Sequence, residues 1–338
     1  MQTAFLGDTA LISSMVGKIG ELYGKDAEIY LIIKNGLEDL FKNDKRVRSI
    51  TTFDKRGTEK DLFGLLKAII KVRRLKLDVM FCVHRSLRSC IITAFSGAKT
   101  KIGFKEAALS SLFTKTVKRE GPHEVLKNHL LLETYDPAFK KIRPLMSSKY
   151  KLYAPAKSSL DELNKTSKEP FIVIAPGSKW HTKRWGTEAY TRLAEKLLKT
   201  YNHDIVFTGD KDDEGLIENI IAGIKSDNLR KRIINQANKL DISNLMFLIS
   251  KASLVITNDS APQHIAVGFA VPVVSIFGPT VKGLGYYPFS DDAVVVEAHD
   301  VKCRPCGLHG HMKCPKKTNE CMTAIKDDYV YNAVRRLI

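Results

Sequence analysis

Short apolar runs alternate with segments of helical periodicity along both halves of this 338-residue chain. Runs of strand length and composition occupy residues 27–33, 77–83, 171–178, 204–209 and 253–258. Apolar residues recur at helical spacing in residues 62–75, 88–95, 188–199, 216–224 and 241–250. Strands that alternate with helices indicate βαβ units, and these units build parallel sheets with helices packed on their faces. The chain is therefore predicted to be an α/β protein.

Residues 146–170 interrupt this alternation with polar, turn-rich sequence, and a short helix is expected within them at about residues 158–165. We interpret this stretch as a connection between two domains. The first domain is expected to span residues 1–155 and the second residues 165–325. Residues 326–338 are expected to form a C-terminal helix that returns to the first domain. Two α/β domains joined in this way leave a cleft, which is a common location for ligands.

The chain is strongly basic, with 54 Lys and Arg against 37 Asp and Glu and a net charge of +17. A basic surface suits nucleic acid, an anionic membrane or a phosphorylated substrate, although an ordinary solvated surface is the alternative. The sequence has no RNP aromatic motif, zinc-finger helix spacing or basic arm, so nucleic acid is not favoured. No apolar run approaches the ~18 residues of a membrane-spanning helix, and residues 1–8 lack the pattern of a secretory signal. We therefore expect a cytoplasmic protein.

Residues 259–264 (Asp-Ser-Ala-Pro-Gln-His) lie between two apolar runs and predict a strand, a tight turn and a helix start. Backbone N–H groups and the helix dipole favour a phosphate at such a place, and ligands of open α/β sheets bind at the carboxyl ends of strands. The loop at residues 176–185 follows another strand. Its Ser178 hydroxyl and Lys183 amine could neutralise the same anion, although a solvated basic loop is the alternative.

Asp8 follows Gly7 where the first strand should end and a helix should begin. It could cap that helix or act as a general base, and the residues alone leave both interpretations open. Arg85 and Arg88 follow the strand that ends at Val83. They could hold a second anionic ligand in the first domain, or they could be plain surface charge.

Four of the six cysteines gather near the C-terminus, at Cys303, Cys306, Cys314 and Cys321. The C-x2-C spacing followed by two further cysteines could hold a tetrahedral zinc ion, while buried reduced thiols or a disulfide are the alternatives. A cytoplasmic setting disfavours the disulfide. Cys82 and Cys90 are expected to be buried small hydrophobes.

The loops after two of the predicted strands together resemble glycosyltransferase family 9, the ADP-heptose:lipopolysaccharide heptosyltransferases. The segments that carry this resemblance are Asn258–His264 with Val271–Thr280, and Pro176–Ser178 with Lys183–Trp185. The N-terminal segment Gln2–Asp8, the segment Arg85–Arg88, the triplet Ile102–Phe104 and the cysteine-rich tail look like the heptosyltransferase II group in particular. The resemblance covers nearly the whole chain. Two departures are visible: Met1 directly precedes Gln2, so the first strand is expected to be short, and Ala261 replaces a glycine that is common in the family.

The resemblance implies a GT-B fold, in which two Rossmann-like domains with parallel sheets face each other across a cleft. It implies an inverting transfer of heptose from ADP-heptose to a heptose of a phosphorylated lipid A–Kdo–heptose acceptor at the inner face of the inner membrane. A different acceptor, as in heptosyltransferase I, and a non-catalytic sugar-nucleotide-binding protein are the alternatives. By resemblance Asp8 is the catalytic base, and Arg85 and Arg88 face the acceptor. The donor residues are Ser178, Lys183, Asp259, Ser260, Ala261, His264 and an acidic residue, Glu214 or else Asp212 or Asp213. The resemblance implies no required cofactor, and the only metal considered is the candidate structural zinc.

Overall fold

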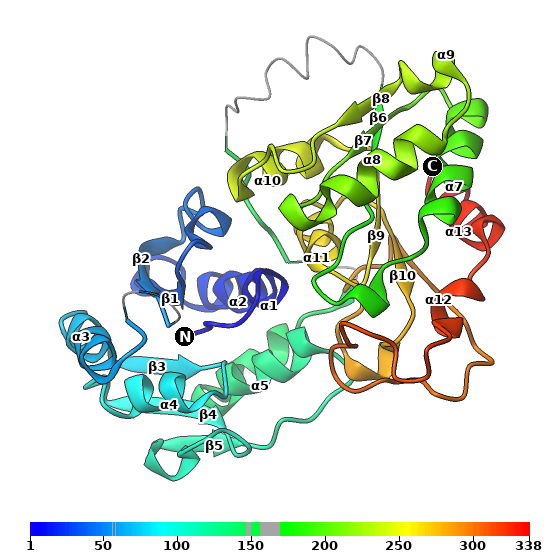
Figure 1. Cartoon of the computed structure of the whole chain (residues 1–338). Helices are drawn as coiled ribbons and strands as arrows, with labels where there is room; N and C mark the ends of the chain where they lie inside the picture. The colour runs from blue at the N-terminus through cyan, green and yellow to red at the C-terminus, as the bar shows by residue number, and fades with distance from the viewer. Residues whose placement is uncertain (56, 58, 147–149, 156–169) are drawn as a thin grey trace. The chain divides into compact units, whose positions relative to one another are not determined.

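The computed structural model describes all residues except 56, 58, 147–149 and 156–169, so the helix expected at about 158–165 lies outside the described residues. The chain forms two compact units, Met1–Tyr153 and Ala154–Ile338. Each unit combines parallel strands with helices, as the alternating pattern predicts (Figure 1).

The first unit contains two small parallel sheets. One sheet pairs β1 (Ile29–Lys34) with β2 (Val47–Phe53), and the other has the order β3 (Val79–Cys82), β4 (Thr100–Phe104), β5 (Lys115–Val117). The helices of this unit are α1 (Leu6–Leu11), α2 (Ser13–Tyr23), α3 (Leu62–Arg73), α4 (Leu87–Ala94) and α5 (Glu124–Tyr135). The strands predicted near residues 27–33 and 77–83 and the helices predicted near 62–75 and 88–95 are confirmed.

Residues Met1 and Gln2 join the two sheets of the first unit. The backbone N–H of Gln2 donates to the carbonyl of Ile32 across 2.9 Å, and the N–H of Val83 donates to the carbonyl of Met1 across 3.0 Å. Gln2 also forms an isolated parallel bridge with Ile33. These two residues therefore lie between β1 and β3 as a very short strand, and α1 with Asp8 begins just beyond its carboxyl end.

The second unit has one parallel sheet with the strand order β11-β10-β9-β6-β7-β8. Its strands are β6 (Phe171–Ala175), β7 (Asp204–Phe207), β8 (Ile233–Asn235), β9 (Leu254–Asn258), β10 (Val273–Phe277) and β11 (Ala293–Glu297). Its helices are α7 (Thr187–Thr200), α8 (Glu214–Gly223), α9 (Asp227–Arg230), α10 (Ile242–Lys251), α11 (Ala261–Gly268), α12 (Glu320–Thr323) and α13 (Asp327–Val334). Helices from both sides cover this sheet in Figure 1.

The local sequence explains why these elements form. The apolar stripe predicted for α7 is buried in the core of the second unit, because residues three and four apart share one helix face. It consists of Tyr190, Leu193, Ala194, Leu197 and Leu198. Helix α10 starts at a cap, since the Asp241 carboxylate accepts a hydrogen bond from the N–H of Asn244 across 2.7 Å. Of the two caps considered for this helix, Asp241 is confirmed.

The expectation that the C-terminal helix returns to the first domain is wrong. Helix α13 packs on α7 and on the β10–β11 side of the second unit's sheet, where Val330 and Val334 are fully buried. The Arg192 side chain of α7 contacts the Asp327 carboxylate across 2.9 Å. The apolar face of α13 is therefore already used within its own unit. No helix in the described part of the chain is both long and apolar enough to span a bilayer.

Candidate active site

The strand order of the second unit reverses direction between β6 and β9. From β6 the chain continues outward to β7 and β8, and it then returns to add β9, β10 and β11 on the opposite side. Ligands of open α/β sheets bind at the carboxyl ends of strands at such a switch point. The loop after β6 carries Ser178 and Lys183, and the turn after β9 carries Asp259 and Ser260. The structure therefore brings these predicted donor residues to one edge of the sheet.

Lys183 and Asp259 form a buried ion pair at this edge. The lysine Nζ lies 2.6 Å from Oδ2 of the carboxylate, and each residue is 7% exposed. The same oxygen accepts a hydrogen bond from the Thr280 hydroxyl at 2.7 Å, and Oδ1 accepts one from the Gln263 amide at 3.0 Å. A buried carboxylate with three donors from three separate segments is held in one geometry, and it holds the lysine amine in turn.

Asn258 fastens the two loops of the site together. Its amide Nδ2 donates to the carbonyl of Pro176 across 2.6 Å, and its Oδ1 accepts from the Tyr190 hydroxyl across 3.0 Å and from the N–H of Trp185 across 3.3 Å. The side chain is completely buried. Asn258 stood in the recognised motif, but sequence reasoning gave it no role because side-chain-to-backbone bonds across loops leave no periodic signal.

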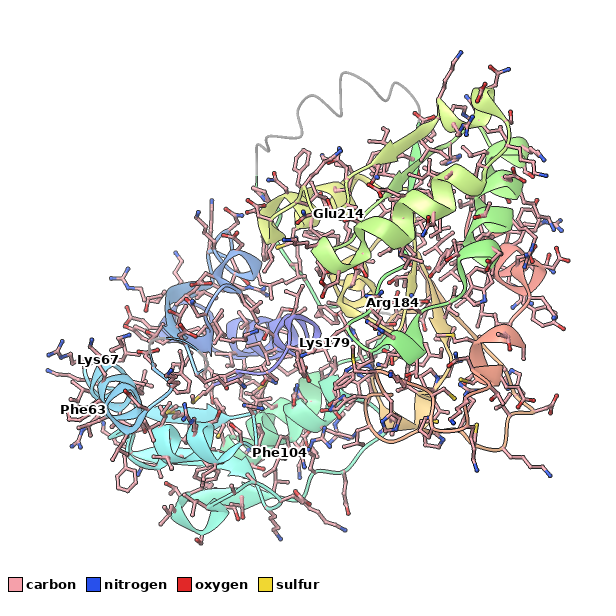
Figure 2. The ribbon with its side chains drawn as sticks, in the orientation of Figure 1. Phe63, Lys67, Phe104, Lys179, Arg184 and Glu214 are labelled. Atoms are coloured by element: carbon pink, nitrogen blue, oxygen red, sulfur yellow. The ribbon has the colours of Figure 1, made fainter. Side chains whose placement is uncertain are left out.

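Asp213 is the acidic residue that the structure brings to the loop after β6. Its carboxylate contacts Arg184 across 2.8 Å, and burial is the main reason that its pKa is raised, with Asp210 adding to the effect and Arg184 opposing it. A Cβ at Gly177 would lie 2.0 Å from its Oδ2, so only glycine fits there. Figure 2 shows Arg184 on this loop, whereas Glu214, preferred on resemblance, is the first residue of α8 and is half-buried.

The turn before α11 has the backbone arrangement expected for an anion site. Ser260 is the residue before the helix, and its hydroxyl lies 2.9 Å from that of Thr257. Ala261 and a proline open the helix, so the positive end of the helix dipole lies at this turn. His264 lies within the first turns and is 4% exposed. Burial lowers the pKa of His264 to about 4, so its imidazole is neutral at pH 7.

The cysteine-rich tail packs against this site. The Thr182 hydroxyl donates to the carbonyl of His311 across 2.8 Å and accepts from the N–H of the same residue across 2.8 Å. The N–H of Cys306 donates to the carbonyl of Pro279 across 2.8 Å. The Trp180 and His309 rings are stacked, with centroids 6.1 Å apart. The segment therefore braces the loops that carry Lys183 and Thr280.

All four tail cysteines are free thiols, and Cys321 is buried while Cys303, Cys306 and Cys314 are half-buried. Burial and the neighbouring thiols raise the pKa of Cys306 and raise the pKa of Cys321 to about 11. Within the residues that the structure describes, no three His, Cys, Asp or Glu side chains are arranged to hold a metal ion. The arrangement therefore does not fit a zinc ion as it stands, and the structural zinc stays a prediction for metal analysis. Cys82 and Cys90 are fully buried, as expected.

Arg304 is a functional candidate that sequence reasoning missed. Its guanidinium contacts the Glu297 carboxylate at 2.6 Å and donates to the carbonyl of Thr280 at 2.8 Å, while its side chain is 6% exposed. Thr280 in turn bonds Asp259, which pairs with Lys183. Arg304 therefore supports the Lys183–Asp259 ion pair indirectly, through Thr280. A lone arginine in a cysteine-rich tail gave no sign of this role.

Asp8 lies in the first turn of α1 in the first unit. The backbone N–H of Phe5 donates to its Oδ2 across 3.3 Å, so Asp8 takes part in capping the start of α1, as one of the two interpretations predicted. The pKa of Asp8 is raised to about 6, chiefly by burial and also by the charge of Glu124, while the Phe5 N–H and Arg119 oppose the rise. A capping carboxylate ordinarily has a lowered pKa. A raised pKa is compatible with a general base that works near neutral pH.

Arg85 and Arg88 differ in their surroundings. Arg85 follows β3 and is exposed, and Ser86 beside it caps α4. The guanidinium of Arg88 donates to the carbonyls of Lys55 and Glu59, each across 3.3 Å. Arg88 therefore holds the loop after β2, whereas the Arg85 side chain extends from the carboxyl end of β3.

Two units built from parallel sheets and helices, with polar loops at the carboxyl ends of their strands, have the architecture of the GT-B fold class. The solved structure of Escherichia coli ADP-heptose LPS heptosyltransferase II matches with a TM-score of 0.78 at 18% identity, covering 99% of this chain and 97% of that chain. The model of glycosyltransferase family 9 (heptosyltransferase) matches residues 65–316. The chain belongs to this family and is a heptosyltransferase.

Relatives of two kinds are similar to the chain. Lipooligosaccharide heptosyltransferase 2 of Campylobacter jejuni is 27% identical over 342 residues, covering 99% of this chain and 96% of the relative. Lipopolysaccharide heptosyltransferase 3 of Escherichia coli is 23% identical over 282 residues, covering 81% of this chain and 80% of the relative. Membership of the family thus leaves the choice of acceptor open.

Proposed function

We propose that this enzyme transfers heptose from ADP-heptose to a heptose of the lipopolysaccharide inner core, with inversion at the anomeric carbon. The observation that carries the proposal is Asp8, a carboxylate whose pKa is raised to about 6 at the start of α1. Most carboxylates in proteins are weaker bases than this, because their pKa lies near 4.

In the reaction, the Asp8 carboxylate accepts the proton of the acceptor hydroxyl. The hydroxyl oxygen forms a bond to the anomeric carbon of the donor, and the bond from that carbon to the ADP oxygen breaks with its electron pair leaving on ADP. General-base assistance of this kind contributes roughly 10²–10⁴-fold to a rate.

The donor diphosphate is proposed to bind at the Lys183–Asp259 edge of the second unit. The lysine amine and the helix start at Ser260 and Ala261 supply positive charge to the leaving phosphate, which is where charge develops in the transition state. His264, neutral at pH 7, can hydrogen-bond the donor without adding charge. Asp213 is our choice for the acidic residue on the ribose side, with Glu214 as the alternative.

The acceptor is proposed to be the phosphorylated lipid A–Kdo–heptose core at the inner face of the inner membrane, with exposed Arg85 facing its anionic groups. The similarity to heptosyltransferase 2 over 99% of the chain favours this acceptor over that of heptosyltransferase 3. The net charge of +17 favours an anionic acceptor on an anionic surface.

The test is ADP release from ADP-heptose in the presence of a heptose-bearing lipid A–Kdo acceptor. We expect wild-type protein and Asp78→Asn to release ADP at the same rate, since Asp78 is an exposed carboxylate paired with Lys99, and Asp8→Asn to release almost none. Equal release by Asp8→Asn would remove the catalytic role of Asp8. Faster transfer to a Kdo-only acceptor would assign the chain to the first transfer of heptose instead.

The reaction is proposed to need no metal ion, because Lys183 and the helix start can carry the leaving-group charge. Activity that survives EDTA would support this, and activity lost to EDTA and restored by a divalent cation would overturn it. Zinc content measured on the same protein tests the cysteine tail. One zinc ion per chain would establish a site there, and less than about 0.2 per chain would reject one.

A further inference from the structure

Helix α3 of the first unit is apolar on two sides. Its buried side packs into a core cluster through Leu65, Ala68, Ile69 and Val72. Its other side exposes Leu62, Phe63, Leu66 and Ile70, which are 79%, 84%, 53% and 45% exposed. These four residues recur at the spacing of one helix face, so they form a continuous apolar surface rather than scattered single residues. A surface of this kind marks an interaction site.

The charged side chains within this helix all have one sign. Lys67, Arg73 and Arg74 lie on the exposed half of α3 and at its end, and the helix from Leu62 to Arg73 contains no acidic residue. Just before the helix, exposed Asp61 places one negative charge at its N-terminal cap, while buried Glu59 pairs with Lys71. Figure 2 shows Phe63 and Lys67 on the outer side of α3.

An apolar face bordered by cations fits the boundary between the headgroups and acyl chains of an anionic membrane. Phe and Leu enter the acyl boundary, while Lys and Arg reach back to the lipid phosphates. A second copy of the same face fits poorly, because a two-fold contact would bring this cationic border close to its own copy. A protein partner would need a matching acidic border, whereas anionic lipids supply negative charge all around the face.

We propose that the exposed face of α3, formed by Leu62, Phe63, Leu66 and Ile70 with Lys67, Arg73 and Arg74, docks the first unit onto an anionic lipid surface. The face is anchored from behind by the core cluster, so it can enter the bilayer boundary without unfolding the unit. This inference deepens the proposed function, which places the acceptor at an anionic membrane surface, and its vesicle test requires neither donor nor acceptor, so the two can fail separately.

The experiment is co-sedimentation of the full chain with vesicles of phosphatidylcholine alone or of phosphatidylcholine mixed with phosphatidylglycerol. We expect binding to the mixed vesicles, weakening as salt rises, and little binding to phosphatidylcholine alone. Phe63→Ser with Leu66→Ser should lower binding to the mixed vesicles by about tenfold or more. Charge reversal by Lys67→Glu and Arg74→Glu should lower it by roughly fivefold or more per residue.

Tyr329→Ser provides the matched control, because Tyr329 is an aromatic residue that is 59% exposed on a helix of the second unit. It should bind vesicles as wild type does, and all variants should keep the wild-type melting temperature because every changed side chain is exposed. Wild-type protein that does not sediment with mixed vesicles would overturn the proposal, as would unchanged binding by the Phe63/Leu66 variant. A wild-type dimer that this variant converts to a monomer would assign the face to a subunit contact instead.

Discussion

In each unit a buried or partly buried carboxylate lies at the edge formed by the carboxyl ends of the strands, and the two carboxylates have different partners. At the second edge, Lys183 forms a buried ion pair with Asp259 that fixes the lysine amine in place, and Asp259 also accepts bonds from Thr280 and Gln263. At the first edge, Asp8 is held by the N–H of Phe5 across 3.3 Å and its pKa is raised to about 6. The second edge is therefore organised in advance to hold an anion, whereas the first keeps a carboxylate in a state that favours taking up a proton.

Asp8→Asn tests the first edge and should give the largest effect. We expect kcat to fall by roughly 10²–10⁴-fold, because the amide cannot accept the proton of the acceptor hydroxyl. The melting temperature should rise rather than fall, since Asn keeps an oxygen for the Phe5 N–H and removes a charge whose burial is unfavourable. Steady-state kinetics and thermal unfolding of the same protein measure both changes.

If Asp8 only caps helix α1, its substitution should leave kcat unchanged. Loss of the cap in Asp8→Ala should then lower the free energy of unfolding by roughly 0.5–2 kcal/mol. Observing that combination would show that the two edges differ in packing and not in chemistry.

Lys183→Met tests the second edge. Removing the lysine leaves the Asp259 carboxylate buried without its countercharge, and we expect a loss of roughly 3–5 kcal/mol of unfolding free energy. Adding Asp259→Asn should recover most of that loss, because the uncompensated charge is then gone. Urea unfolding of wild type, the two single variants and the double variant gives the coupling free energy between Lys183 and Asp259. Additive losses in this cycle would contradict a preorganised pair.

The sequence predicts more of this second edge than of the first. Long apolar runs and helical stripes located β6, α7, β9 and α11 closely, because both periodicities are strong in a large parallel sheet. The strands β2, β4 and β5 of the first unit were not predicted, and neither were the two edge strands β8 and β11 of the second unit. These strands are short or mixed in polarity, and apart from the buried end of β4 most of their residues are partly exposed, so their pairing depends on neighbours that are distant in sequence.

The site residues also divide into those that a local pattern predicts and those that it does not. Ser178, Lys183, Asp259 and Ser260 were predicted at one edge because each follows a recognisable strand. Thr280 and Arg304 act through bonds between distant segments, and no local pattern announces such bonds. Glu124, which helps to raise the pKa of Asp8, was missed for the same reason.

Gly177→Ala should have a smaller effect on the second edge. The added methyl group would meet the Asp213 carboxylate at 2.0 Å, so the loop or the carboxylate must move. We expect a loss of about 1–3 kcal/mol in unfolding free energy, together with a higher KM for the donor and little change in kcat. Gly186→Ala is a matched control, because a Cβ there meets its nearest contact, a Glu188 oxygen, at 3.7 Å. An unchanged KM in Gly177→Ala would separate this loop from donor binding.

The pH profile gives the finest test of the difference between the edges. If Asp8 is the base, kcat/KM should fall about tenfold per pH unit below about 6 and be level above it, whereas an ordinary carboxylate would keep the plateau down to about pH 4. Stability should depend on Asp8 with the opposite sign. A carboxyl group whose pKa is raised in the folded protein stabilises the fold while it is protonated, and that contribution is lost as pH rises through about 6.

Asp8→Asn should therefore stabilise the protein by about 1–2 kcal/mol at pH 7, after allowance for the partial exposure of the residue, and by nothing at pH 4. Melting temperatures of the wild type and the variant across this range measure the difference. A stabilisation that stayed constant with pH would mean that packing, and not the charge of Asp8, separates the two proteins. The raised pKa would then lose its connection with the inflection in the rate profile.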